Sequence, residues 1–230
     1  MNYAEKIVDK FDQDFSENYE RKVRATVPGY EITHAMVRSI LGSILSNKAD
    51  VLILGSGTGM EFVTLGKDQQ GWRFTGVDPS PDMLAIANAR VNKQGLGDRV
   101  NLVKGFVSDL PEKKQFDAAV SVLVMHFLPD DGAKLAFLKA TAARLRPGAP
   151  LILVDMHGDK STPAFEQLYQ SWKCYLESLG YDHSSLDKEL ELVHFVQEER
   201  IVSLMEQAGF NSISRFHQAY LFGGWFGRRL

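Results

Sequence analysis

Short apolar runs alternate with helical stretches through the middle of the chain, and no other feature restricts the fold as strongly. Between the runs, Ser80-Pro81-Asp82 has the residues of a helix N-terminus, and Leu135–Leu145 has helical periodicity. The runs have polar ends and are rich in Val, Ile, Leu and Phe, as buried parallel strands are. They cover Asp50–Leu54, Trp72–Val77, Val100–Val103, Phe116–Val124 and Ala149–Val154. This alternation predicts an α/β fold in which βαβ units form a doubly wound parallel sheet.

The two ends of the chain differ from the middle. Residues 1–48 read as two or three helices broken at Val27-Pro28-Gly29, and residues 163–208 read as helices that begin after Thr162-Pro163. Beyond them, Ser212–His217 and Ala219–Phe222 are β segments too close together to be parallel neighbours, which need a crossover of about a dozen residues. We therefore expect an antiparallel hairpin at the edge of the sheet.

These patterns predict one domain with three parts. A helical cap covers residues 1–48, the α/β core covers 49–158 and 210–230, and a helical cap insert covers 159–209. Ligands of such sheets bind outside the carboxyl ends of the strands, so both caps are expected over that edge. The apolar tail Tyr220–Phe226 predicts a terminus that is buried or that faces a second copy in a homodimer.

Composition excludes several classes of protein. The net charge of -3 and the pI near 6.1 argue against nucleic acid as a partner, and the basic clusters Glu20–Arg24 and Gly227–Arg229 read as solvated faces, with a tRNA contact as the alternative. Cys174 is the only cysteine, which rules out an internal disulfide and a cysteine-built zinc site. No pair of histidines or acids has metal-ligand spacing, so no metal is expected. Met1–Lys10 is not a signal peptide, and no run approaches the ~20 apolar residues of a membrane span, so we expect a cytoplasmic protein.

A glycine-rich loop follows the first predicted strand. The stretch Val51–Gly59 contains Gly55, Gly57 and Gly59, with one residue between each glycine and the next. Glycines permit positive φ angles and let a ligand approach the backbone, and the helix that follows presents free N–H groups. A tight turn without a ligand is the alternative, because a glycine-rich turn alone is weak evidence.

An acid, Asp78, ends the second predicted strand about 20 residues beyond the loop, where a carboxylate can accept from both ribose hydroxyls of a nucleoside. The alternative is an acid that caps the turn. We place Pro79 and Met83 with the nucleoside site, although Met83 could equally be a core residue. A dinucleotide loop has its third glycine one position later, where this chain has Met60, and Glu61 in the first helical turn suits a cationic ligand. The pattern points to S-adenosylmethionine rather than NAD.

Over nearly its whole length the sequence resembles the class I S-adenosylmethionine-dependent methyltransferases, which have a Rossmann-like sheet. The matching stretches are Val51–Gly59, Phe74–Leu84, Val103–Pro111, Phe116–Leu128, Leu145–Asp155 and Gln207–Phe210. The resemblance implies that the methionine part of the cofactor lies against Gly55, Ser56, Gly57 and Gly59. It also implies that Asp78 takes the ribose and that Phe106, Val107 and Ser108 border the adenine.

Two positions depart from the family pattern. The family has an acid where this chain has Ile53, and a second acid, which meets the adenine amine, where it has Phe106. Phe106 could instead stack on the purine. Asp109 could supply the missing acceptor, or it could cap the turn at Leu110-Pro111.

Both ends of the chain are similar to one branch of that superfamily, the carboxy-S-adenosylmethionine synthases of tRNA wobble-uridine modification. The similar stretches are Phe11–Leu45 and Ala208–Gly223, and Tyr30 matches a tyrosine that contacts the cofactor in that branch. The branch also has an arginine that holds the extra carboxylate, whereas the corresponding segment here, Leu186–Leu190, has none. A buried carboxylate without a paired cation is unfavourable, and Lys188 offers only a point charge. We therefore predict ordinary methyl transfer, with the carboxylating activity as the alternative.

Candidate catalytic residues follow the fourth and fifth predicted strands. Methyl transfer needs an aligned acceptor, exclusion of water and, for some acceptors, a base. His126 is a residue type that suits a base at neutral pH, and Asp155 could orient His157 or meet an acceptor. A helical stripe over Phe165–Leu179 reads as core whose upper end could line an apolar acceptor pocket. The predicted function is methyl transfer from S-adenosylmethionine to a small-molecule acceptor, and a non-catalytic nucleoside-binding protein is a further alternative.

Overall fold

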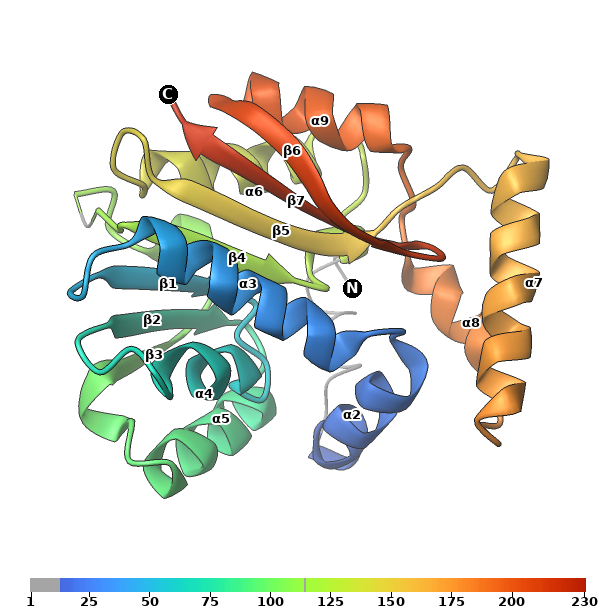
Figure 1. The fold of residues 1–230 in the computed structure, drawn as a ribbon, viewed down its shortest axis with the longest axis horizontal. Helices are drawn as coiled ribbons and strands as arrows, with labels where there is room; N and C mark the ends of the chain where they lie inside the picture. The colour runs from blue at the N-terminus through green and yellow to red at the C-terminus, as the bar shows by residue number, and fades with distance from the viewer. Residues whose placement is uncertain (1–12, 114) are drawn as a thin grey trace.

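The computed structural model describes residues 13–113 and 115–230, so residues 1–12 of the expected N-terminal cap lie outside the described residues. In this part of the chain a seven-stranded sheet has the order β3-β2-β1-β4-β5-β7-β6 (Figure 1). β1 to β5 are parallel, and β7 and β6 add an antiparallel pair at one edge. The strands are β1 (Asp50–Leu54), β2 (Arg73–Asp78), β3 (Val100–Lys104), β4 (Ala118–Val122), β5 (Pro150–Met156), β6 (Phe210–Ala219) and β7 (Phe222–Arg229). The predicted doubly wound fold is confirmed.

Helices begin and end where the sequence has capping residues. The Ser80 Oγ accepts from the Met83 N–H at 3.2 Å, and the Thr162 Oγ1 accepts from the Phe165 N–H at the same distance. The predicted break before Tyr30 is confirmed, with Gly29 at a φ of 73°. The α-helices are α2 (Gln13–Thr26), α3 (Tyr30–Ile44), α4 (Met60–Gly66), α5 (Pro81–Lys93), α6 (Ala133–Ala143), α7 (Pro163–Ser178), α8 (Leu186–Glu189) and α9 (Glu198–Gln207). Short 3₁₀ turns are η1 (Gly97–Arg99), η2 (Val107–Asp109), η3 (Met125–Phe127) and η4 (Leu190–Leu192).

Side chains alternate between the two faces of the sheet along each strand, and helices cover both faces. In β1, Val51 and Ile53 pack with α3, α4 and α5, whereas Leu52 and Leu54 pack with α6 and α9 (Figure 1). The continuous apolar runs of the sequence reflect this two-sided burial. A third apolar cluster lies at the carboxyl ends of β4 and β5, where α2, α7 and α8 gather.

The C-terminal hairpin is confirmed, but its second strand is longer than predicted. The expected segment Ala219–Phe222 contains the turn, and β7 runs on to Arg229 between β5 and β6. The sequence analysis did not extend this strand past Phe222, because the glycines that follow are unfavourable in strand interiors. Here they give space to aromatic rings, because a Cβ at Gly224 would lie 2.6 Å from the Phe216 ring. Trp225 is fully buried, so the tail packs against its own sheet.

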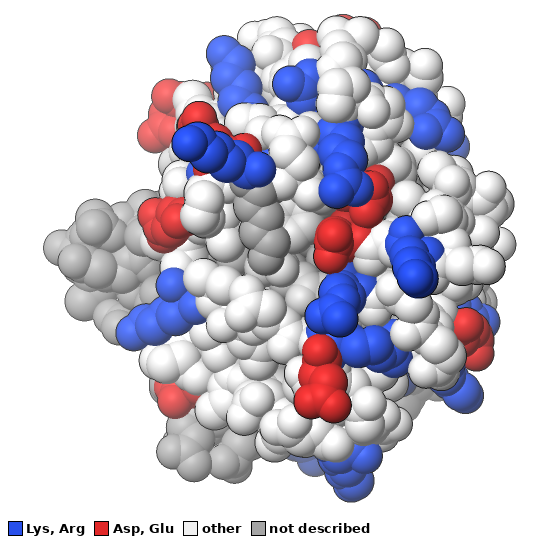
Figure 2. Space-filling model, turned by 90° about the vertical axis from the view of Figure 1, so that its left-hand side faces the viewer, with Lys and Arg blue, Asp and Glu red and all other residues white. Residues whose placement is uncertain are grey.

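The side of the molecule where the parallel strands begin carries mixed charges (Figure 2). A hollow there is lined by Lys48, Arg73, Arg99 and Arg146 together with two aspartates. Arg146 pairs with Asp117, and Arg99 donates to three backbone carbonyls, so these two cations hold loops together. Among the described helices, none is long and apolar enough to cross a membrane.

Candidate active site

Two adjoining cavities open at the carboxyl ends of the strands. The first, called the loop cavity, is bordered by the glycine loop, the end of β2, the β3–η2 turn and residues 122–124 and 127–128. The second, called the cap cavity, lies under α2, α7 and α8. Tyr19, Leu123 and Phe127 line both cavities, so the two are neighbours.

The glycine loop has a distinct role for each glycine. A Cβ on Gly55 would lie 2.4 Å from the Val124 side chain, so a larger residue would push the β4 end away. Gly57 has a φ of 47°, and a Cβ there would meet no atom closer than 3.9 Å. Its open side belongs to the loop cavity. Gly59 lies outside both cavities and packs against Ala87 of α5 at the start of α4.

Asp78 is buried at the end of β2 and lines the loop cavity. Its Oδ2 accepts from the Gly57 N–H at 2.8 Å, and its Oδ1 accepts from the Ser80 N–H at 2.9 Å. Burial raises the pKa of Asp78 above its ordinary value, although the two N–H donors oppose that shift. A carboxylate has about four lone-pair sites, so each oxygen can accept one more hydrogen bond from a ligand.

An apolar slot continues the loop cavity beyond Asp78. Pro79, Met83, Phe106 and Val107 line it, as predicted for a nucleoside site. The Asp109 carboxylate accepts from the Phe106 N–H at 2.8 Å, so it caps the η2 turn. Two other predicted residues do not line the cavity. The Ser108 carbonyl accepts from Arg144, and Ser56 is buried behind the loop against Gly76.

The structure places Tyr19, rather than Tyr30, at the cavities. Tyr30 lines neither one; its ring lies 4.4 Å from that of His34 and under the Arg24 guanidinium. Burial raises the pKa of the Tyr19 phenol, as do the carboxylates of Glu61 and Asp78, so it stays protonated. The sequence analysis missed Tyr19. The signal was the spacing of Tyr19 and Val23 on one face of a helix, which indicates burial but not a ligand.

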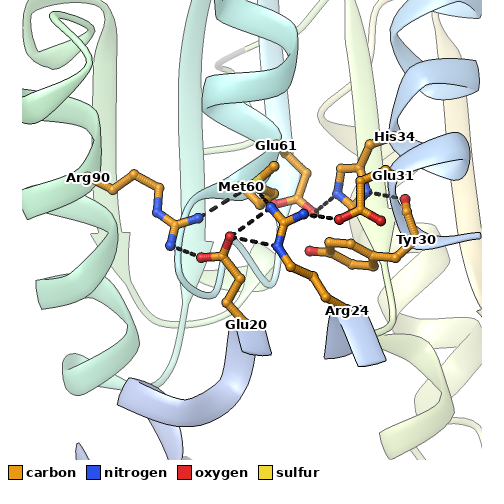
Figure 3. Close-up of polar contacts among 8 residues, drawn as sticks. All are labelled: Glu20, Arg24, Tyr30, Glu31, His34, Met60, Glu61 and Arg90. Carbon is orange, nitrogen blue, oxygen red and sulfur yellow. Dashed lines mark hydrogen bonds and ion pairs between the residues drawn. The ribbon is translucent and has the colours of Figure 1, made fainter. Parts of the chain in front are cut away.

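Ion pairs hold α2 against the body of the protein (Figure 3). Glu20 accepts from Arg24 at 2.8 Å and also pairs with Arg90 of α5. Both guanidinium groups also approach the Met60 Sδ, at 3.5 and 3.4 Å. Burial opposes ionisation of Glu20, but the two arginines outweigh it and lower the pKa of this carboxyl. The N-terminal basic cluster of the sequence is therefore partly neutralised within the fold.

A histidine–aspartate pair lies in the wall of the cap cavity. His126, in η3, is buried and lines the cavity, and its Nδ1 hydrogen-bonds to the fully buried Asp155 carboxylate. Asp155 also accepts from the His126 and Met156 backbone N–H groups. A carboxylate only accepts, so Nδ1 carries a proton, and Nε2 is an acceptor when the ring is neutral. Among the described residues, no group hydrogen-bonds to Nε2.

His157 is separate from this pair. Its ring packs edge-to-face on Trp225 at 5.1 Å, and burial lowers its pKa. It lines neither cavity. The expectation that Asp155 orients His157 is therefore not what the structure shows, because the Asp155 carboxylate faces His126. Sequence position could not separate the two histidines, since both follow strand ends at one edge.

Among the described residues that line the loop cavity, Asp78 is the one with a charged side chain. No lysine or arginine lines it among residues 13–113 and 115–230, and Lys188 lines neither cavity. Within the same residues, no group of three His, Cys, Asp or Glu side chains is placed to hold a metal ion. Gly57 and Asp78, with the apolar slot beyond them, fit a neutral or cationic nucleoside better than an anionic one.

Comparisons with known proteins agree with this geometry. Residues 51–148 match the model of a methyltransferase domain family. The chain is 28% identical to the demethylmenaquinone methyltransferase of Lactiplantibacillus plantarum, over 74% of this chain and 73% of that protein. It is 25% identical to the carboxy-S-adenosyl-L-methionine synthase of Campylobacter curvus, over 89% and 87% of the two chains.

A solved structure extends the comparison to the fold. The crystal structure of an S-adenosylmethionine-dependent methyltransferase from Methanosarcina mazei matches with a TM-score of 0.61 and 19% identity, over 83% of this chain and 97% of that one. The predicted motifs, the sheet order and the sequence relatives all indicate the same family and the same cofactor. Residues 51–148 are thus a methyltransferase domain, and the findings together support a class I S-adenosylmethionine-dependent methyltransferase.

Proposed function

We propose that the loop cavity binds S-adenosylmethionine and that the cap cavity binds an apolar acceptor whose reacting atom carries a proton, such as a phenolic hydroxyl. The observation that carries this proposal is the His126–Asp155 pair, because Asp155 holds the Nδ1 of His126, and His126 lines an otherwise mainly apolar cavity. Phe127, the residue after His126, lines both cavities, so the base and the cofactor site are adjacent.

Each part of the site has a role in this reaction. When bound, the cofactor supplies an electrophilic methyl group. Asp78 would hold the ribose, Gly57 would leave room for the methionine part, and Met83, Phe106 and Val107 would border the adenine. His126 Nε2 takes the proton from the hydroxyl that is to be methylated, and Asp155 fixes the tautomer and stabilises the imidazolium that forms. The apolar walls keep water from the reacting atoms.

The test replaces each histidine in turn. His126→Gln should lower methyl transfer to simple phenols by about 10²- to 10⁴-fold, the usual contribution of a general base. Binding of S-adenosylhomocysteine, measured by calorimetry, should stay within twofold of wild type. His157→Gln is the matched control and should retain activity. Full activity in His126→Gln, or its loss in His157→Gln, would contradict the assignment.

A second candidate is synthesis of carboxy-S-adenosylmethionine, because relatives of that name align over 89% of the chain. The lining of the loop cavity argues against it, since a second carboxylate there would have no cationic partner among the described residues. Competition binding should show S-adenosylmethionine at least tenfold tighter than the carboxylated form. A preference for the carboxylated form would favour the second candidate.

A further inference from the structure

The cap cavity is apolar except at a few places. Val23, Leu123, Met156, Trp172 and Phe222 form much of its wall. Beside His126, the polar lining residues are Tyr19, Thr26, Lys22 and Glu189. The Thr26 hydroxyl donates to the Lys22 carbonyl at 3.0 Å, and the buried Tyr19 stays protonated, so neither brings a charge. Among the described residues that line the cavity, the permanently charged side chains are therefore Lys22 and Glu189.

These two side chains pair with each other across the cavity. The Lys22 Nζ lies 2.5 Å from the Glu189 Oε1, with side-chain exposures of 28% and 26%. Lys22 belongs to α2 and Glu189 to α8, so the pair joins the N-terminal cap to the cap insert. Ser185 Oγ also donates to the same carboxylate oxygen at 2.7 Å. One positive and one negative charge thus cancel within the acceptor side of the site.

Other charged side chains on the caps lie nearby. Asp187, two residues before Glu189, pairs with Lys173 at 3.7 Å and accepts from the Tyr169 hydroxyl. Arg21, next to Lys22, donates to Asn18 at 3.1 Å. Asn18 is neutral, so Arg21 keeps its charge, but neither Arg21 nor Asp187 lines the cavity.

We propose that the Lys22–Glu189 pair is a charge filter that makes the cap cavity select neutral acceptors. This inference rests on the proposed function, because it takes the cap cavity as the acceptor site. An anionic acceptor would compete with Glu189 for Lys22 and leave one carboxylate half-buried without a cation. An ammonium-bearing acceptor would compete with Lys22 for Glu189 in the same way. A neutral acceptor avoids both penalties, since breaking a charged pair is unfavourable in a partly desolvated site.

Removing one partner should reverse the preference. Glu189→Gln keeps the size of the side chain but removes the negative member of the Lys22 pair, so anionic acceptors should gain. Lys22→Met keeps the length of the side chain but leaves Glu189, so cationic acceptors should gain. The double variant Lys22→Met/Glu189→Gln is neutral again and should recover the neutral preference. Asp187→Asn is the matched control, because it removes a cap charge that does not line the cavity.

The experiment measures binding of three phenols of similar size: 4-ethylphenol, which is neutral, 3-(4-hydroxyphenyl)propionate, which is anionic, and tyramine, which is cationic. Trp172 lines the cavity, so quenching of its fluorescence reports occupancy. Trp72 and Trp225 are fully buried elsewhere, and Trp172→Phe gives the background signal. Titrations are done at pH 7.5 with S-adenosylhomocysteine present, and stability is checked by thermal unfolding.

Wild type should bind 4-ethylphenol about tenfold more tightly than either charged phenol. Each single variant should improve binding of its own charged probe about tenfold and leave the other charged probe weak. Equal binding of all three phenols by wild type, or single variants that shift both charged probes alike, would overturn the filter. If no phenol quenches Trp172, the cavity does not take this class of acceptor and the filter falls as well.

A methylation assay with the same phenols separates the two proposals. Charge-selective binding without methyl transfer to any phenol would contradict the proposed function and leave the filter standing. Methyl transfer to all three phenols with equal efficiency would support the proposed function and overturn the filter.

Discussion

The loop cavity and the cap cavity are built in different ways. The loop cavity is formed largely by backbone turns at the ends of neighbouring strands, and two backbone N–H groups fix its carboxylate, Asp78. The cap cavity is formed by side chains from α2, α7, α8 and two strand ends. The first kind of site is encoded in short, continuous stretches of sequence. The second depends on how distant segments pack together.

The difference also concerns what holds each wall in place. β1 and β2 are interior strands of the sheet whose own side chains are mostly buried, so the loop between β1 and α4 has a rigid base. The cap wall depends on α2, which is held to α5 by the Glu20–Arg90 ion pair and to α3 by the Arg24–Glu31 ion pair (Figure 3). Partly exposed ion pairs contribute little to stability. We therefore expect substitutions in the loop to act on binding more strongly than substitutions in α2.

The largest effect is expected at Gly57. Gly57→Val would place a side chain in the loop cavity and strain a residue with a φ of 47°, so binding of S-adenosylhomocysteine should weaken more than about 100-fold, or ~3 kcal/mol. Gly95→Val is the control, because Gly95 also has a positive φ, 68°, and open space, but lies outside both cavities. Calorimetry should show near-normal affinity for the control. Similar losses in both variants would mean that backbone strain, not the cavity, explains the effect.

The contrast between the cavities explains what could be predicted from the sequence. A strand, a turn and a spacing placed Gly57 and Asp78 at one edge, and the family resemblance added Phe106; all three line the loop cavity. The parallel strands were predicted to within a few residues, since two-sided burial leaves continuous apolar runs. β7 was misplaced because its glycines serve the Phe216 and Trp225 rings, which only the tertiary structure reveals.

Only the general outline of the cap cavity could be predicted from the sequence. The sequence placed helices over the ligand edge, but no local pattern indicates that Lys22 meets Glu189 or that Asp155 faces His126 rather than His157. The members of such a pair are far apart in the sequence: His126 and Asp155 are separated by 29 residues. Their partners are chosen by packing, and one residue type fits several partners equally well. The sequence therefore predicts neighbours that backbone geometry determines, but not the side-chain pairs of the cap cavity, which depend on tertiary packing.

A smaller effect is expected from the two tyrosines, and it tests where the cap touches the cofactor. Tyr19→Phe should weaken binding of S-adenosylhomocysteine about 5- to 12-fold, or ~1 to 1.5 kcal/mol, which is within the range for loss of one hydrogen bond. Tyr30→Phe should change it less than about twofold, because that ring packs on His34 outside both cavities. Fluorescence or calorimetric titration distinguishes them. A larger loss in Tyr30→Phe would show that the cap contacts the cofactor through the residue that the family resemblance indicated.

The smallest effect concerns His34, which joins the cap to the loop. Its Nδ1 lies 2.9 Å from the Tyr30 carbonyl oxygen and its Nε2 lies 3.1 Å from the Glu61 Oε1 (Figure 3). Both partners accept when Glu61 is ionised, so both ring nitrogens then donate and His34 is an imidazolium. Burial alone would lower the pKa of His34, but Glu61 outweighs it and raises the pKa above its ordinary 6.5.

The sign of the pH dependence follows from that raised pKa. The stabilisation from the pair is fully present below pH 6.5 and is lost as pH rises through the higher pKa of the folded state. Urea unfolding of wild type and His34→Gln should therefore differ by about 1 kcal/mol near pH 6, with the difference shrinking toward pH 9. Using the difference removes the titration of the other histidines. A difference that is constant with pH, or that grows in alkali, would mean that His34 is neutral in the fold and that the junction between cap and loop carries no charged pair.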